Sequence, residues 1–146
     1  MTDDPWQTNQ VLARLPTDYR AVHYVGTRFP GSPAVAASPG LRQGANCQLF
    51  AYAILRYFGL NPPPVRSSEL WADEQTTMRV SVAQPLDLVL VNGTSDAWGA
   101  HVGVWVGDEG VLHLCAEVGR PAVWPMSEFA ARHRYRTLIG IKRVRA

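Results

Sequence analysis

A cysteine and two histidines have the residue types and the spacing of a thiol-based catalytic site. Cys47 is expected to open a helix that runs to about Phe58, with Asn46 as its N-cap and Gly59 at its end. At a helix start, unpaired backbone N–H groups and the helix dipole favour negative charge. The sequence therefore predicts that the pKa of this thiol lies below its usual value of about 8.5.

His101 and His113 fall twelve residues apart in consecutive predicted strands. If the hairpin between them turns near Gly107, the two imidazoles lie side by side across the strand pair. The rings share one face of the sheet only if the connection has an odd length or a β-bulge. A plain two-residue turn at residues 108–109 would place them on opposite faces.

The chemistry that uses such a group is acyl transfer to a thiolate. One histidine takes the thiol proton and later protonates the leaving amine, while the second fixes the tautomer of the first. The backbone N–H of Cys47 would form part of an oxyanion hole. The alternative is structural: a free cysteine often packs as a small hydrophobe, and two strand histidines are commonly ordinary core or edge residues.

The elements that must position these residues change in type along the chain. Apolar spacing is helical before residue 75, and short Val-rich runs separated by turn residues follow it. The expected helices are at residues 8–15, 17–27, 47–58 and 68–73, with a loop at 28–44 and a helical turn at 127–133. The expected strands are at residues 86–91, 101–106, 111–115, 120–124 and 137–144. This order predicts an α+β domain in which N-terminal helices pack on a mostly antiparallel sheet of five to six strands.

Length and composition favour one globular domain over residues 1–146. Residues 1–43 form a helical and loop extension, and residues 44–145 form the core. Two cysteines are too few for a disulfide scaffold. Residues 1–131 carry eight basic and twelve acidic residues, and residues 132–146 carry six basic and none acidic. Because apolar residues alternate with that basic cluster, it indicates a final strand with a solvated rim, and we expect no nucleic-acid partner.

The start of the chain is acidic and no apolar run follows it, so both parts of a secretory signal peptide are missing. No stretch approaches the length needed to span a membrane. The sequence predicts a cytoplasmic protein with no membrane partner, unless it is exported by a non-classical route.

The order and spacing of these segments resemble the NlpC-type cysteine peptidases, a family with a compact papain-like fold. The matching segments are Asn46-Cys47-Gln48-Leu49-Phe50, Gln84-Pro85-Leu86-Asp87-Leu88-Val89, His101 to Gly107, Leu112-His113-Leu114 and Tyr135 to Arg145. The resemblance implies Cys47 as nucleophile, His101 as general base and acid, and His113 as the group that orients His101. It implies no cofactor and no metal, and a peptide or N-acyl substrate such as a peptidoglycan stem peptide.

The chain also departs from the family pattern. Members usually have Asp-Cys-Ser-Gly at the nucleophile, where the acid and the serine help to hold the free amine of a stem peptide; here Asn46 and Gln48 flank the cysteine. The loss of this negative charge weakens the argument for an amine-terminated substrate. The usual glycine before the strand aspartate is Leu86. The tyrosine found about a dozen residues before the cysteine has no counterpart, since Tyr24 and Phe29 lie too far upstream.

Four residues are candidates for substrate binding. Asn46 and Gln48 flank the nucleophile, Asp96 belongs to a polar loop that would border the cleft, and Trp98 is a candidate stacking platform beside His101. The Pro- and Gly-rich segment at 28–44 is a candidate wall or lid because it directly precedes the nucleophile.

Cys115 shares a strand face with His113 and leaves several alternatives open. It is a packed core thiol, a redox partner of Cys47, a second nucleophile, or a ligand that completes a metal site with Cys47, His101 and His113. The closely spaced ligand pairs of structural zinc sites are missing. Two alternatives to a hydrolase remain: a metal-binding module that uses these four residues, and a non-catalytic interaction domain on the same fold.

Overall fold

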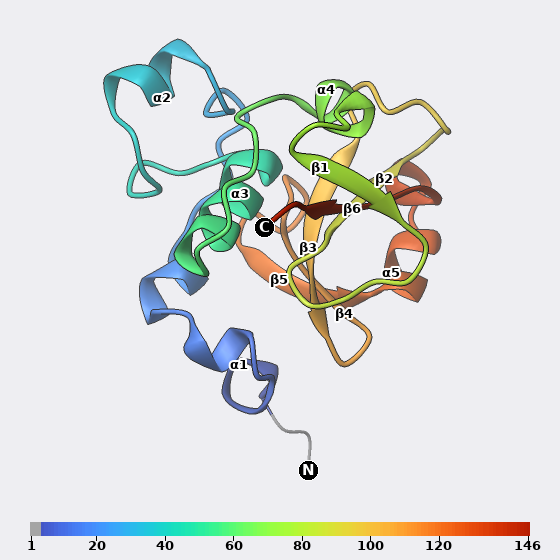
Figure 1. Cartoon of the computed structure of the whole chain (residues 1–146). Coiled ribbons are helices and arrows are strands. Elements are labelled where there is room, and N and C mark those ends of the chain that lie inside the picture. Colours follow the sequence, from blue (N-terminus) through green and yellow to red (C-terminus); the bar gives the residue numbers. More distant parts are fainter. Residues whose placement is uncertain (1–3) are drawn as a thin grey trace.

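The computed structural model describes residues 4–146 (Figure 1), so residues 1–3 of the predicted N-terminal extension lie outside the described residues. Within this range the helices are α1 (Pro5–Thr8), α2 (Pro33–Ala37), α3 (Cys47–Tyr57), α4 (Ser67–Ala72) and α5 (Met126–Ala130), with 3₁₀ turns at Leu12–Arg14, Thr17–Ala21 and His133–Tyr135. The strands are β1 (Thr77–Val80), β2 (Leu88–Asn92), β3 (His101–Gly107), β4 (Gly110–Leu114), β5 (Pro121–Pro125) and β6 (Thr137–Val144). No helix of residues 4–146 is long and apolar enough to cross a bilayer.

The described strands form one antiparallel sheet in the order β1-β6-β2-β3-β4-β5. The predicted α+β fold is confirmed, and five strands begin within two residues of their predicted positions. The exception is β1, which the sequence analysis missed. It is four residues long and only Thr77 is fully buried, so it carries almost no apolar alternation.

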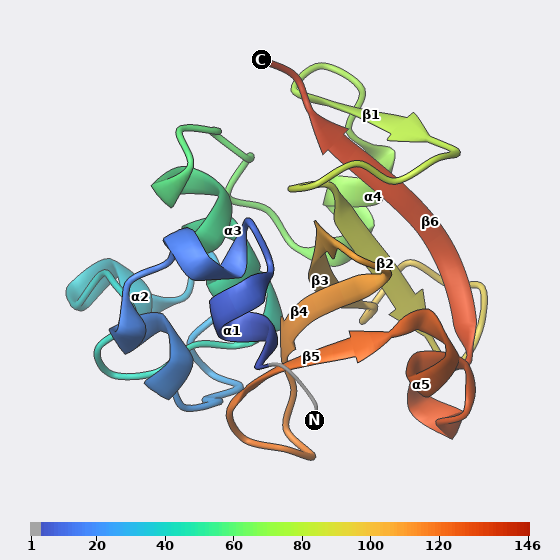
Figure 2. The ribbon, with the colours of Figure 1, turned by 90° about the horizontal axis from the view of Figure 1, so that it is seen from below.

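The two faces of the sheet carry different cores because successive strand residues point to opposite sides. Leu88 and Leu90 of β2 pack into the cluster that contains Phe50 of α3, whereas Val89 packs with Phe129 of α5 on the other face. Figure 2 shows this arrangement, with the N-terminal segments gathered around α3 on one side of the sheet and α5 on the other. Helix α3 and the cluster that contains Phe129 therefore lie on opposite faces of the sheet.

The N-terminal helices at residues 8–15 and 17–27 were predicted wrongly. Asn9 ends α1, and its side-chain oxygen accepts hydrogen bonds from the N–H groups of Val11 and Leu12, both at 2.9 Å. Its amide donates to the carbonyl of Val106 at 3.0 Å. Farther on, Tyr24 leaves any helix to pair with Ala45 in an isolated parallel bridge. Side-chain caps and tertiary pairing therefore override the helical spacing of the apolar residues.

Arg28 organises the segment that was predicted as a loop. Its buried guanidinium donates to the carbonyls of Gly44 at 2.8 Å and Gly40 at 2.9 Å, and also to those of Ala34 and Ser38. The segment contains α2, which begins where the Ser32 side chain accepts from the N–H of Val35 at 3.3 Å. Hydrogen bonds from one arginine side chain, more than regular secondary structure, hold the backbone of this segment.

Candidate active site

The hairpin between β3 and β4 contains the bulge that same-face histidines require. Its tip is a two-residue turn in which Asp108 and Glu109 both have positive φ angles, of 54° and 61°, as a type I′ turn needs. Gly107 pairs with Gly110, but the register shifts between Gly107 and Trp105. The extra residue in the bulge shifts the alternation of side chains between the two sheet faces by one position. The imidazoles of His101 and His113 therefore point to the same face, whereas the turn alone would place them on opposite faces.

A hydrogen bond of 2.8 Å joins His101 Nε2 to His113 Nδ1. Gly103 lies opposite His113, and a Cβ at Gly103 would come within 3.2 Å of the Cβ of His113. The absence of a side chain there leaves room for His101 to reach diagonally across the strand pair. If Nε2 of His101 donates this bond, its Nδ1 is left with a free lone pair, which is the state a general base needs.

Aromatic rings pack against both histidines and contribute to their burial. The ring of His113 lies 4.2 Å from that of Trp124 and 4.7 Å from that of Phe129, and the ring of His101 lies 4.8 Å from that of Tyr135, all between centroids. Burial lowers the pKa of His101 to about 3 and also lowers that of His113, with positive neighbours acting in the same direction. Both imidazoles are therefore neutral in the resting protein at neutral pH.

The start of α3 presents Cys47 as predicted. The Asn46 side chain accepts from the N–H of Leu49 at 2.8 Å, and the Asn46 carbonyl accepts from Phe50 N at 3.1 Å. Among the described residues, no backbone carbonyl accepts from the N–H groups of Cys47 and Gln48, and both N–H groups lie near the thiol sulfur. These two donors beside the thiol are suited to binding an oxyanion.

The predicted lowering of the thiol pKa is wrong. Burial raises the pKa of Cys47 to about 11, although the backbone N–H groups of Val102 and Gln48 and the charge of Arg66 oppose the rise. Loss of water around the sulfur thus outweighs the helix start. The resting pair is a neutral thiol beside a neutral imidazole.

Cys47 and His101 face one small cleft of about 130 Å³. The cleft is lined by Tyr24, Cys47, Asn92, Gly99, Ala100, His101, Cys115, Ala116, Arg134 and Tyr135. Cys47 is partly accessible, whereas a non-catalytic domain on this fold would have an occluded thiol and no cleft.

Of these lining residues only Cys47 and His101 were predicted as site residues, and Cys115 was left as an open alternative. Tyr24 was set aside as too far upstream, yet its bridge to Ala45 brings it to the cleft. Arg134 and Tyr135 come from the turn before β6. The basic cluster was interpreted as a strand rim, and nothing in its spacing marks Arg134 as a cleft residue.

The four predicted substrate-binding residues lie outside the lining of the cleft. Asn46 is buried and its side-chain oxygen caps α3, and Gln48 is buried beside it. Asp96 accepts from the N–H of Trp98 at 2.9 Å in the loop that leads to the cleft, and Trp98 is 73% exposed. Trp98 is thus an exposed loop residue, and the Asn46 oxygen is engaged by the backbone of α3.

Cys115 lines the cleft but is only 1% exposed. It packs in the cluster that contains Phe129 and Tyr135, on the sheet face that carries α5. Both cysteines are free thiols. Within residues 4–146, no three His, Cys, Asp or Glu side chains lie close enough together to hold a metal ion. The structure therefore does not assemble Cys47, His101, His113 and Cys115 into a ligand set.

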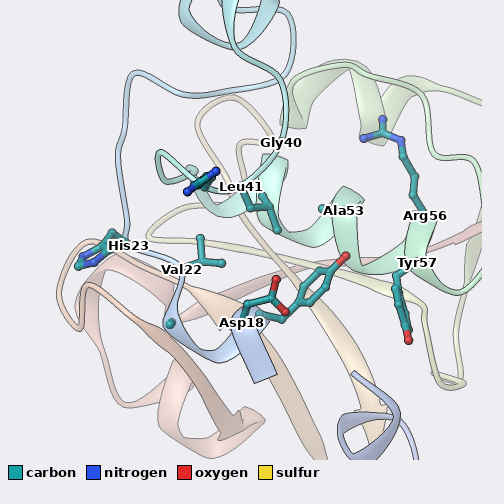
Figure 3. A pocket seen from close by; sticks show the side chains of 11 residues that line it. Asp18, Val22, His23, Gly40, Leu41, Ala53, Arg56 and Tyr57 are labelled. Carbon is teal, nitrogen blue, oxygen red and sulfur yellow. The ribbon is translucent and has the colours of Figure 1, made fainter. Parts of the chain in front are cut away.

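A larger hollow of about 950 Å³ lies on the outer side of α3. Figure 3 shows Arg56 and Tyr57 of α3 on one side of it and Asp18, Val22 and His23 of the N-terminal segment on the other. Residues 40–42 also line it, so the proposed lid segment borders this hollow and not the cleft. The hollow contains no cysteine, and the His23 ring is engaged by Arg120 at 2.9 Å.

A solved structure of an NlpC/P60 protein shares the fold of this chain. An NlpC/P60 family protein from Bacillus cereus ATCC 10987 matches with a TM-score of 0.53 and 17% identity over 69% of this chain, which spans about a third, 32%, of that protein. The NlpC/p60 domain of the peptidoglycan hydrolase SagA matches with a TM-score of 0.47 and 21% identity, over 73% of this chain and 84% of that one. No family model and no curated protein matches the sequence. The predicted NlpC-type fold is thereby confirmed.

Proposed function

We propose that this protein is a cysteine hydrolase that cleaves an amide bond through a thioacyl intermediate on Cys47. The observation that carries the proposal is the 2.8 Å bond between His101 and His113 at a cleft that Cys47 also lines. A nucleophile, a base and a group that orients the base are the parts of a thiol hydrolase.

In the first half of the reaction, Cys47 Sγ bonds to the substrate carbonyl carbon while its proton passes to His101 Nδ1. The N–H groups of Cys47 and Gln48 hold the oxyanion that forms. When the intermediate collapses, the C–N bond breaks and His101 returns the proton to the leaving amine. Water then attacks the thioester with His101 as base, and Sγ leaves and regains its proton.

The raised thiol pKa and the lowered imidazole pKa values decide how the proton moves. In a buried site neither a lone thiolate nor a lone imidazolium is stable, so proton transfer accompanies the attack on the carbonyl. His113 acts during that step, because its Nδ1 accepts the Nε2–H of His101 and supports the transient imidazolium.

The resemblance to NlpC-type peptidases makes peptides of the bacterial cell wall the first substrates to test. Purified protein is incubated with wall-derived peptides and with simple N-acyl amides, and products are followed by mass spectrometry. The proposal predicts cleavage products with the unaltered protein and none with Cys47→Ala. Cleavage at an equal rate by both proteins would contradict it.

A further inference from the structure

Arg134 is the only charged residue among those that line the cleft. Its side chain is 61% exposed, so its guanidinium can meet a ligand that arrives from solvent. A second cation, Arg66, stacks on the ring of Phe29 at 4.1 Å and is close enough to favour the thiolate form of Cys47. The one charged side chain that lines the cleft is therefore positive, and the charge of Arg66 acts on Cys47 in the same sense.

The carboxylate closest to Arg134 is already engaged. Glu117 Oε1 lies 3.7 Å from Arg134, but Glu117 Oε2 lies 2.6 Å from Arg132, which also pairs with Glu128 at 3.2 Å. Glu117 thus makes its short ion pair with Arg132, and the Arg134 pair is too long for a hydrogen bond. Among the described residues no carboxylate holds the Arg134 guanidinium in a direct hydrogen bond.

The residues that flank the nucleophile add no compensating negative charge. Asn46 and Gln48 are neutral, and both are buried away from the cleft lining. A substrate amine in the cleft would therefore meet Arg134 and no acidic lining residue. A substrate carboxylate would meet a guanidinium that can form two parallel N–H···O bonds.

We propose that the cleft selects an amide substrate that carries a carboxylate next to the scissile bond, and that Arg134 binds this carboxylate. This inference rests on the proposed hydrolase function, since it names the substrate class for the same cleft. Arg134 is a binding residue: it attracts and orients the anion while His101 and Cys47 do the chemistry.

The test compares two alkylating probes that differ in charge at the same leaving group. Iodoacetate and iodoacetamide both alkylate a thiolate with loss of iodide, and only iodoacetate is anionic. The ratio of their rates at Cys47, followed by peptide mass spectrometry, is independent of the thiolate fraction at a fixed pH. It therefore reports charge preference alone.

The variants are Arg134→Gln, Arg134→Lys and the charge-matched control Arg145→Gln. Arg145 is exposed and donates to the Glu74 carbonyl at 3.2 Å, at the end of the chain beyond β6. We expect Arg134→Gln to lower the iodoacetate-to-iodoacetamide ratio about fivefold. Arg134→Lys should keep the ratio within about twofold, because the charge remains. Arg145→Gln should leave it unchanged, and added salt should reduce the preference of the unaltered protein.

Two outcomes would overturn the inference in distinguishable ways. If Cys47 is alkylated but the ratio is the same in the unaltered protein and in Arg134→Gln, the anion preference is wrong and the hydrolase proposal survives. If neither probe alkylates Cys47 in folded protein even at a pH where its thiolate forms, both proposals fail, because no substrate group could reach the sulfur. An equal fall in Arg134→Gln and Arg145→Gln would assign the effect to net charge and also contradict a role for Arg134.

Discussion

Two hollows border α3, and they differ in size and in chemistry. One lies at the start of the helix, beside Cys47, and the other lies beside Ala53, Arg56 and Tyr57. The larger, about 950 Å³, is lined by charges of both signs and by Tyr57, which is 47% exposed. The smaller, about 130 Å³, has a thiol, an imidazole and two backbone N–H donors that no backbone carbonyl binds. Volume alone would select the wrong hollow, since a reaction needs a nucleophile and a base within reach of one carbonyl.

The contrast arises from how each hollow is built. The cleft rests on a helix start, two strands and a bulge, which fix its reacting groups by backbone hydrogen bonds. The larger hollow lies between α3 and an irregular N-terminal segment whose backbone is held mainly by the side chains of Arg28 and Asn9. Sites on regular elements hold their geometry more closely than sites between loops.

The largest expected effect is that of removing the nucleophile. Cys47→Ala should lower the rate of amide hydrolysis by about 10⁴-fold or more, because the other thiol that lines the cleft, Cys115, is only 1% exposed. The melting temperature should change little, since Cys47 is only partly buried. The hydrolysis rate of a wall peptide that the unaltered protein cleaves tests the first expectation, and thermal unfolding tests the second. Hydrolysis that persists in Cys47→Ala would show that the cleft at Cys47 is not the reactive hollow.

The next effect concerns the orienting group. His113→Ala should lower kcat by about 10²-fold, because His101 loses the acceptor that fixes its tautomer. His113→Asn should recover part of that loss, since an amide oxygen can accept the same N–H. Equal kcat values for the two variants would reduce His113 to a packing role, and thermal unfolding of both separates loss of orientation from loss of fold.

The buried histidines also predict a pH dependence of stability. In the unfolded chain each histidine binds a proton near pH 6.5, whereas in the folded protein the pKa of His101 is about 3 and that of His113 is also lowered. Protons therefore favour the unfolded state as the pH falls below 6.5, and the stabilisation is complete above it. The free energy of unfolding should fall by about 1.4 kcal/mol per pH unit for each histidine between pH 6 and pH 4.

Urea unfolding at pH 6, 5 and 4 measures this slope. His113→Asn removes one of the two titrating groups, so it should show about half the slope over the same range. A slope that is unchanged in this variant would mean that His113 is not the neutral, buried group that its position predicts.

The smallest expected effect lies in the larger hollow. Tyr57→Ala removes an exposed ring that packs on Tyr19 and Phe58. Hydrolysis should stay within about twofold of that of the unaltered protein, because Tyr57 has no contact with the cleft residues. A tenfold loss of kcat would show that the larger hollow takes part in the reaction.

Much of the cleft could be predicted from sequence because its parts have local signals. The Asn46 cap, the helix from Cys47 and the strands that carry His101 and His113 all follow from capping residues and alternation. The shared face of the two histidines could not be predicted. It depends on a bulge between Trp105 and Gly107, which the alternating Val-Trp-Val sequence does not reveal.

The misjudged parts depend on contacts between distant segments. Arg28 binds backbone carbonyls up to sixteen residues away, and such side-chain bonds have no periodicity to detect. Tyr24 reaches the cleft through a single bridge to Ala45. The thiol pKa was predicted in the wrong direction because burial is a tertiary property, and it outweighs the helix start at Cys47.

The most direct test of the central claim, that His101 activates Cys47 as a general base, is the pH profile of acylation by p-nitrophenyl acetate. The burst of p-nitrophenolate gives the rate, and mass spectrometry locates the acetyl group. With a neutral thiol and imidazole, the rate in the unaltered protein should be nearly constant between about pH 5 and pH 9, with acylation at Cys47 and not at Cys115. In His101→Ala the reaction needs free thiolate, so the rate should be lower and rise about tenfold per pH unit. The same profile in both proteins, or equal acylation of both cysteines, would contradict the claim.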